Sequence, residues 1–221
     1  MNNHHPMKTT LKTVLLGSLL VAASLQSTAM ADGTGLYARL EPGVSVLRDI
    51  KVSSNAGVDY KLSSKAGFSI SGATGYAFSP NWALELESGY SRNNFDTIHD
   101  ITVSGVTSPV SLKYPGHASL VPIITSLIWS PNLTASVKAN LGAGLGAAVV
   151  TSESSFGGVH SSTTETAFAG QFRTGFSAAI SKNVEANVGY RLCLISDIEK
   201  SGVKVQDLVS HTFSAGISVR F

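Results

Sequence analysis

The chain is poor in charge, in cysteine and in long apolar runs, and each scarcity argues against a class of protein. Charged residues make up 14% of the 221 positions, against about 25% in soluble domains. The single cysteine, Cys193, rules out an intramolecular disulfide. Beyond residue 31, no apolar run approaches the roughly 18 residues that indicate a transmembrane helix. These scarcities disfavour a soluble domain, a disulfide-rich secreted domain and a helical membrane protein.

The first 31 residues have the three parts of a secretory signal peptide. These are a basic start at Lys8 and Lys12, an apolar stretch over residues 14–25, and small residues at the two positions that signal peptidase recognises, Ala29 and Ala31. We predict cleavage before Asp32 and a single domain over residues 32–221. The alternative is a retained anchor helix, but the apolar stretch is shorter than the about 20 residues that a spanning helix needs.

The predicted mature domain carries no net charge. Removing the signal removes two of the 16 basic residues and none of the 14 acidic ones, which leaves 14 of each. No basic patch remains, so we expect no nucleic-acid partner. We also predict no cofactor and no metal site.

Three short segments recur at a fixed spacing. They are Ser79-Pro80-Asn81-Trp82, Ser130-Pro131-Asn132-Leu133 and Ser181-Lys182-Asn183-Val184, with their asparagines 51 residues apart both times. Each lies where one alternating apolar and polar run ends and the next begins, as expected of a tight turn. Three tight turns separated by longer polar loops predict four hairpins, with both chain ends on the turn side.

The runs between these turns alternate with a period of two, which is typical of strands with one apolar and one polar face. The last run, from Ser210 to Phe221, places apolar residues at nearly every odd position. The eight predicted strands cover residues 36–46, 68–78, 82–90, 120–129, 133–145, 168–180, 184–194 and 210–221. We therefore predict an all-β fold, an eight-stranded antiparallel up-and-down β-barrel.

Two features complicate this prediction. The run over residues 120–129 is apolar on both faces, so its register cannot be assigned. Pro42 and Pro122 each remove a backbone donor from a strand. We expect a local bulge at each proline.

Alternation alone does not say which face lies inside. A soluble barrel of the lipocalin kind would point its apolar set inward, whereas a transmembrane barrel points it at lipid. The second arrangement is favoured because the polar set is mostly small, the connections are short at one end only, and aromatic residues gather beside the turns. Those aromatic residues are Phe78, Trp82, Trp129 and Phe221.

In these features the chain resembles the small outer-membrane β-barrel proteins of Gram-negative bacteria, a group that includes the barrel of outer-membrane protein A. The resemblance rests on the segment from Gly75 to Glu85, the glycine-rich run from Asn140 to Gly146, and the terminal strand ending in Arg220-Phe221. It implies an outer-membrane location. It also implies that the outer-membrane assembly machinery recognises a terminal signal formed by Phe213, Ile217, Val219 and Phe221.

The inward positions of the predicted strands carry charges of both signs. They are Arg39, Glu41, Glu85, Glu87, Lys138, Arg173, Glu185, Arg191 and Arg220. In a narrow interior these should pair and plug the lumen, since an eight-stranded barrel has just enough room for its own side chains. The alternative is a narrow ion path along the same charges.

The four polar connections, near residues 49–66, 93–116, 151–165 and 197–209, face outward on this interpretation. Connections on a rigid scaffold often carry recognition, so host or phage molecules, outer-membrane lipid and lipopolysaccharide are candidate partners. We predict a structural and surface-interaction role with no catalytic residue. The alternatives are a narrow porin-like channel and a lipid-A-modifying enzyme, although adjacent Ser210 and His211 would point to opposite faces and could not form a catalytic pair.

Overall fold

A computed structural model describes residues 34–55, 57–156, 159–200 and 202–221. The predicted signal peptide, including Ala29 and Ala31, lies outside the described residues. Within the described ranges, no helix is long and apolar enough to cross a membrane.

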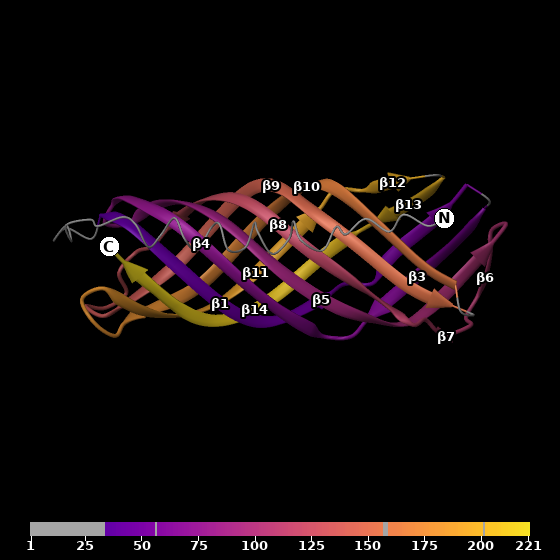
Figure 1. Cartoon of the computed structure of the whole chain (residues 1–221), viewed down its shortest axis with the longest axis horizontal. Coiled ribbons are helices and arrows are strands. Elements are labelled where there is room, and N and C mark those ends of the chain that lie inside the picture. The colour runs from indigo at the N-terminus through magenta and orange to yellow at the C-terminus, as the bar shows by residue number, and fades with distance from the viewer. Residues whose placement is uncertain (1–33, 56, 157–158, 201) are drawn as a thin grey trace, which may run out of the picture.

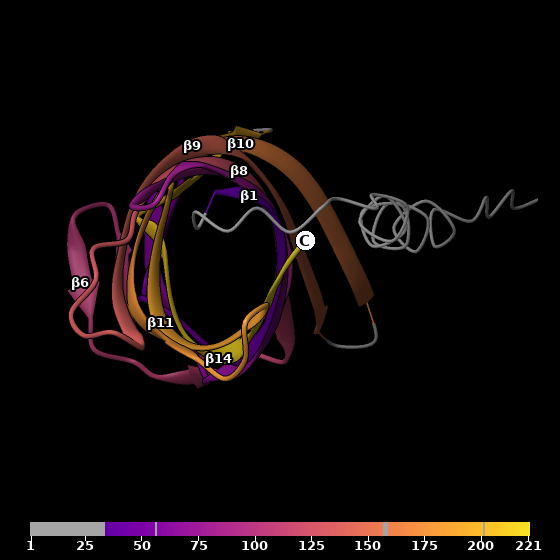
Figure 2. The same ribbon diagram turned by 90° about the vertical axis from the view of Figure 1, so that its left-hand side faces the viewer.

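Eight antiparallel strands close into a ring (Figures 1 and 2). In ring order they are β1 (Gly35–Leu47), β4 (Gly67–Ser79), β5 (Trp82–Val103), β8 (Gly116–Trp129), β9 (Val137–Phe156), β10 (Val159–Ala179), β11 (Val184–Ile195) and β14 (Leu208–Arg220). The first and last of these strands pair with each other, which closes the sheet. The predicted eight-stranded up-and-down barrel is confirmed.

The pairing register fixes the tilt of the strands. A path that starts at Arg92 and crosses from partner to partner around the ring returns to β5 at Trp82, ten residues earlier. A stagger of ten over eight strands corresponds to a tilt of roughly 40°. Ten residues at that tilt rise about 25 Å, which is the height of the apolar band of an outer-membrane barrel.

The apolar face of the barrel points outward, as predicted. Leu84, Phe172 and Ile217 are 51%, 55% and 50% exposed, although each lies in the middle of a strand. Their polar neighbours along the strands point into the lumen and are buried. Beside the turns, the rings of Trp82 and Trp129 lie 6.3 Å apart on the outer face.

The structure assigns the register of the strand that is apolar on both faces. Ile124 and Ile128 of β8 point inward and are 0% and 3% exposed, whereas Ile123 and Leu127 point outward. The neighbouring strand β9 leaves room for the two inward isoleucines because its inward positions are glycines. A Cβ on Gly142, for example, would lie 2.5 Å from the Cδ1 atom of Ile128.

The expected bulges at the two prolines are wrong. Pro42 pairs with β4 in regular register, and Pro122 does so with β9. On its other side, the strand lacks two residue pairings at each proline. At Pro42 these are pairings to β14, and at Pro122 they are pairings to β5, and in both cases the register is the same before and after the gap. The ladder thus tolerates each missing N–H as a gap, without an inserted residue.

The three repeated segments lie at one end of the barrel, which we call the turn end (Figure 1). The first turn is tight, with β4 ending at Ser79 and β5 beginning at Trp82. The second is longer than predicted. Its following strand begins at Val137 rather than at residue 133, because the backbone N–H groups of Leu133 and Thr134 bond to the carbonyl of Val137 and hold a turn there.

The opposite end, the loop end, is built from strands and not from irregular loops, which corrects the prediction for the four connections. β5, β9 and β10 run on beyond the ring, and six short strands join them. These are β2 (Ile50–Ser54), β3 (Val58–Ser64), β6 (Val106–Ser108), β7 (Leu112–Lys113), β12 (Ile198–Lys200) and β13 (Val203–Gln206). Their apolar residues alternate with Ser, Lys and Asp, and this alternation was masked by the polar composition. In Figure 2, β6 and the ends of β9 and β10 lie on opposite sides of the ring.

Glycine in β9 should be needed for closure of the barrel. A Cβ on Gly146 would overlap the backbone carbonyl oxygen of Ile123, so we expect Gly146→Ala to destabilise the folded barrel by about 1–3 kcal/mol. Urea unfolding in lipid vesicles measures this. Gly170→Ala is the matched control, because its Cβ would meet only the Cδ2 atom of Leu145, at 3.7 Å. Equal effects of the two substitutions would contradict the argument.

Candidate functional site

Six of the nine predicted lumen charges form one buried cluster, which we call the inner charge cluster. Its members are Arg39 and Glu41 of β1, Glu85 and Glu87 of β5, Arg173 of β10 and Arg191 of β11. Their side chains are only 2–9% exposed. Three guanidinium groups face three carboxylates, so the cluster is balanced in formal charge.

Each arginine in the cluster contacts more than one carboxylate. Arg39 donates to Glu85 at 2.7 Å and to Glu87 at 3.0 Å. Arg191 donates to Glu41 at 2.7 Å, and Arg173 to Glu85 at 3.0 Å. Because these strands come from opposite parts of the ring, the ion pairs span the lumen and fill its middle.

Neutral side chains complete the cluster, and the prediction missed them. The Tyr37 hydroxyl donates to Glu85 at 2.6 Å, and the Gln171 amide donates to Glu87 at 3.3 Å. The hydroxyl of Ser71 accepts from Arg191 at 2.9 Å. All three occupy inward positions of the alternating pattern, which was the signal available in the sequence.

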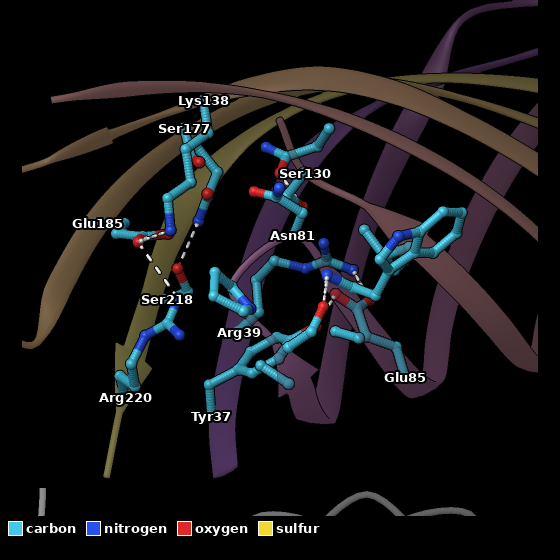
Figure 3. A pocket seen from close by; sticks show the side chains of 18 of the residues that line it. Tyr37, Arg39, Asn81, Glu85, Ser130, Lys138, Ser177, Glu185, Ser218 and Arg220 are labelled. Atoms are coloured by element: carbon cyan, nitrogen blue, oxygen red, sulfur yellow. Dashed lines mark hydrogen bonds and ion pairs between the residues drawn. The ribbon is translucent and has the colours of Figure 1, made fainter. Parts of the chain in front are cut away.

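The remaining three predicted lumen charges lie apart, at the turn end. Glu185 lies 3.6 Å from the amine of Lys138 and 3.4 Å from the guanidinium of Arg220. These side chains are 23–25% exposed and line a cavity of about 60 Å³, whose inner end is lined by Tyr37 and by Arg39 and Glu85 of the inner charge cluster (Figure 3). The structure therefore divides the predicted single network into a buried part and a part at the mouth.

An apolar cluster lies in the lumen between the inner charge cluster and the loop end, beside the buried and hydrogen-bonded Ser45, Asn93 and Ser210. Its buried members are Leu47, Ile50, Val52, Leu62, Phe95, Ala118, Leu120, Ile124, Ala148, Ala167, Ala169, Cys193, Ile195 and Leu208. Several come from β2, β3 and the ends of the ring strands, so the short loop-end strands cover the barrel mouth with their apolar faces. The sequence prediction placed no apolar layer inside the barrel.

The polar face of the loop-end strands carries lysines paired with aspartates. Lys61 donates to Asp100 at 2.8 Å, and Lys51 lies 2.7 Å from Asp207. The hydrogen bond from Lys61 lowers the pKa of the Asp100 carboxyl below its usual value. Because the charges alternate in sign, this surface has no strong net field to attract polyanions.

The four residues of the predicted terminal signal lie along β14 and at the chain end. Phe213 and Ile217 are exposed on the outer face, and the Phe213 ring lies 5.1 Å from that of Tyr190. Val219 shares this face, and the N–H of Phe221 donates to the carbonyl of Leu36 at 2.9 Å.

The adjacent Ser210 and His211 point to opposite sides of the barrel wall. Ser210 lies in the lumen, 3.3 Å from the hydroxyl of Ser45, whereas His211 bonds to the Tyr190 hydroxyl at 2.7 Å on the outer face. In the described part of the chain, no three His, Cys, Asp or Glu side chains are grouped to hold a metal ion. The geometry brings no nucleophile, base and orienting carboxylate together at these positions.

Comparison with known proteins identifies the fold. Neisserial surface protein A (NspA) is 22% identical, with 85% of this chain and 97% of that chain covered and a TM-score of 0.53. OprG from Pseudomonas aeruginosa is 12% identical, with 86% and 98% covered and a TM-score of 0.54. The outer membrane protease OmpT from Escherichia coli is 10% identical, with 89% and 99% covered and a TM-score of 0.51. At these identities the likeness extends to the fold alone.

A search of curated proteins finds no match. The family described as the outer membrane protein beta-barrel domain matches residues 15–221, which include the whole described barrel. The closed ring of strands, the outward apolar band and the family match all indicate an outer-membrane barrel. The chain therefore belongs to the outer membrane protein beta-barrel family and is a protein of the bacterial outer membrane.

Proposed function

We propose that this protein is a structural and surface-interacting barrel with a closed lumen, and that its recognition surface lies at the loop end. Short turns of outer-membrane barrels face the periplasm and longer connections face outward, so the loop end is extracellular on this proposal. The observation that carries it is the filling of the lumen by two layers in series.

The two layers oppose conduction for different reasons. In the inner charge cluster, a passing ion would have to displace arginines whose contacts to Glu41 and Glu85 are as short as 2.7 Å. In the apolar cluster, Ile124, Ala148 and Ala169 are 0% exposed, and an ion would lose its hydration there and gain no oppositely charged partner. These layers support a plug over a narrow channel.

The outer rim offers contacts to lipopolysaccharide. Arg92 lies on the outer face of β5, ten residues along the strand from Trp82 toward the loop end. Its guanidinium donates to the Nδ1 atom of His117 at 3.3 Å. A basic group at that height suits the phosphates of lipid A. Ser210 and His211 lie on opposite faces and cannot act together on that lipid, and lipid A mass spectrometry on overexpressing cells should show an unchanged profile.

Removing one member of the inner charge cluster should be costly. Glu87→Ala leaves three buried guanidinium groups with two carboxylates, so we expect a loss of about 3–5 kcal/mol in the free energy of unfolding. Urea titration in vesicles measures it. Glu185→Ala is the control, because its ion pairs are longer and partly exposed, and we expect a loss of no more than about 1 kcal/mol. A Glu87→Ala barrel as stable as wild type would refute the buried-pair argument.

Because the lumen is closed, we expect the protein not to conduct ions across a lipid bilayer. Wild-type protein in a planar lipid bilayer should give no steady conductance, and Glu87→Ala should also give none, because the apolar cluster remains in place. Large, steady openings of the wild-type protein would rule out the plug and favour the channel.

We propose that Phe221, with Phe213, Ile217 and Val219, forms the signal for the assembly machinery. Deleting Phe221 removes the terminal aromatic group but leaves the charge cluster intact. We expect a lower yield of heat-modifiable barrel in outer-membrane fractions, with unchanged refolding of purified protein in detergent. A normal cellular yield would argue against the signal, whereas failure to refold would assign Phe221 to stability instead.

A further inference from the structure

At the loop end, the described residues leave a seam in the wall beside β10, where a long stretch of strand is hydrogen-bonded on one side only. From Ala169 onward β10 pairs with both neighbours, but residues 159–167 pair with β9 alone. On the far side of the seam β11 ends at Ile195, and the chain continues into β12, whose ladder partner is β13. We call residues 159–167 the β10 edge.

The backbone groups that face the seam follow from two hydrogen bonds. The N–H of Ser155 in β9 donates to the carbonyl of Pro115, away from β10. Its antiparallel partner His160 must then direct its own N–H and C=O away from β9. Phe168 is an even number of residues further along the strand, so its backbone faces the same side. Its carbonyl accepts from the N–H of Ser196 across the seam at 2.9 Å. The backbones that point into the seam are therefore those of His160, Ser162, Thr164 and Thr166.

The β10 edge carries few of the devices that usually protect a free strand, and the inward charge of Glu165 is the main one. The other short loop-end strands β6, β7 and β12 have three, two and three residues, which is too short to template a partner. The β10 edge has nine residues, with no proline, no lysine and no register shift against β9. In Figure 2 it stands away from the ring. One ion pair, between Lys200 of β12 and Glu165, reaches across the seam.

The seam also has a chemical preference. Its inner wall at the base is apolar, formed by buried Ala167 and Ile195 and by partly buried Ile198. The inward side chains of the β10 edge itself are polar, at Ser161, Thr163 and Glu165. A second copy of this edge would therefore lay polar groups against the apolar base. A foreign strand with apolar residues at alternate positions fits better.

We propose that the β10 edge is a strand-addition site for an extended segment of a partner protein that alternates apolar and polar residues. Main-chain hydrogen bonds to the four seam-facing residues would supply the affinity, and apolar side chains on the inner face would supply the preference. This inference rests on the proposed surface-interaction role and names the class of its partner.

A one-edged peptide tests the proposal. The probe is a fluorescent nine-residue peptide of alternating Val and Thr, N-methylated at every second residue so that only one edge can pair. The control peptide is N-methylated at every residue. Fluorescence anisotropy with full-length barrel in detergent micelles should show saturable binding of the probe and at least about tenfold weaker binding of the control, since main-chain pairing is lost. Equal binding of both would overturn the proposal.

A matched pair of variants tests the location. Ser162→Pro removes a seam-facing N–H and spares the ladder with β9, because only odd-numbered residues bond there. Ser162→Ala keeps the N–H. We expect the proline variant to lose at least about tenfold in affinity and the alanine variant to match wild type, with both retaining the heat-modifiable mobility of a folded barrel. Unchanged binding by Ser162→Pro would overturn the site.

Two further results separate the alternatives. Lys200→Ala removes the ion pair across the seam and should strengthen probe binding, while Lys204→Ala, whose partner is Asp197, should not. A concentration-dependent dimer that Ser162→Pro abolishes, without probe binding, would make a second copy the occupant and overturn the proposal. If the barrel conducts ions and binds the probe, the closed lumen alone is refuted. If the barrel does not conduct and does not bind the probe, the strand-addition site alone is refuted.

Discussion

Closure of the backbone hydrogen-bond ladder is the constraint on which the structure depends. In lipid an unpaired N–H or C=O has no water to bond with, so a sheet can span the membrane only as a closed ring. The pairing of β1 with β14 meets this requirement. Pro42 and Pro122 each leave a gap in one ladder only, and the register on both sides of the gap is unchanged. The ring thus tolerates a missing donor without a change of register at either proline.

Closure with a stagger of ten also determines what the lumen can contain. Eight strands leave room for side chains but little more, so large inward groups require small ones opposite. The glycines of β9 make room for Ile124 and Ile128, and the long arginines meet glutamates from across the ring. Charge balance follows from the same confinement, because a buried guanidinium without a carboxylate would be far costlier than the pair.

Beyond the membrane the requirement for closure lapses, since water can satisfy backbone groups. The wall there is continued by short strands that lay Ile50, Val52 and Leu62 over the barrel mouth and turn lysines and aspartates outward. It is also there that the residues of β10 before Phe168 have no ladder partner on the β11 side. The short strands thus close the lumen, while β10 keeps an open edge beside them, and the surface available for recognition follows from where pairing stops.

The sequence by itself determined the strand count and which residues share a face, because a period of two is a local property of each strand. The small polar set, the short connections at one end and the aromatic residues beside the turns then favoured an outward apolar face, with the charges inside. The sequence did not determine the partners of those charges, the register of β8 or the sheet at the loop end. Glu185 and Glu87 look alike in the pattern, yet one lies at the mouth and the other in the middle of the lumen. That difference depends on the stagger between strands distant in the chain. Only the closed tertiary structure fixes the stagger, since each pairing register is set by all eight strands together.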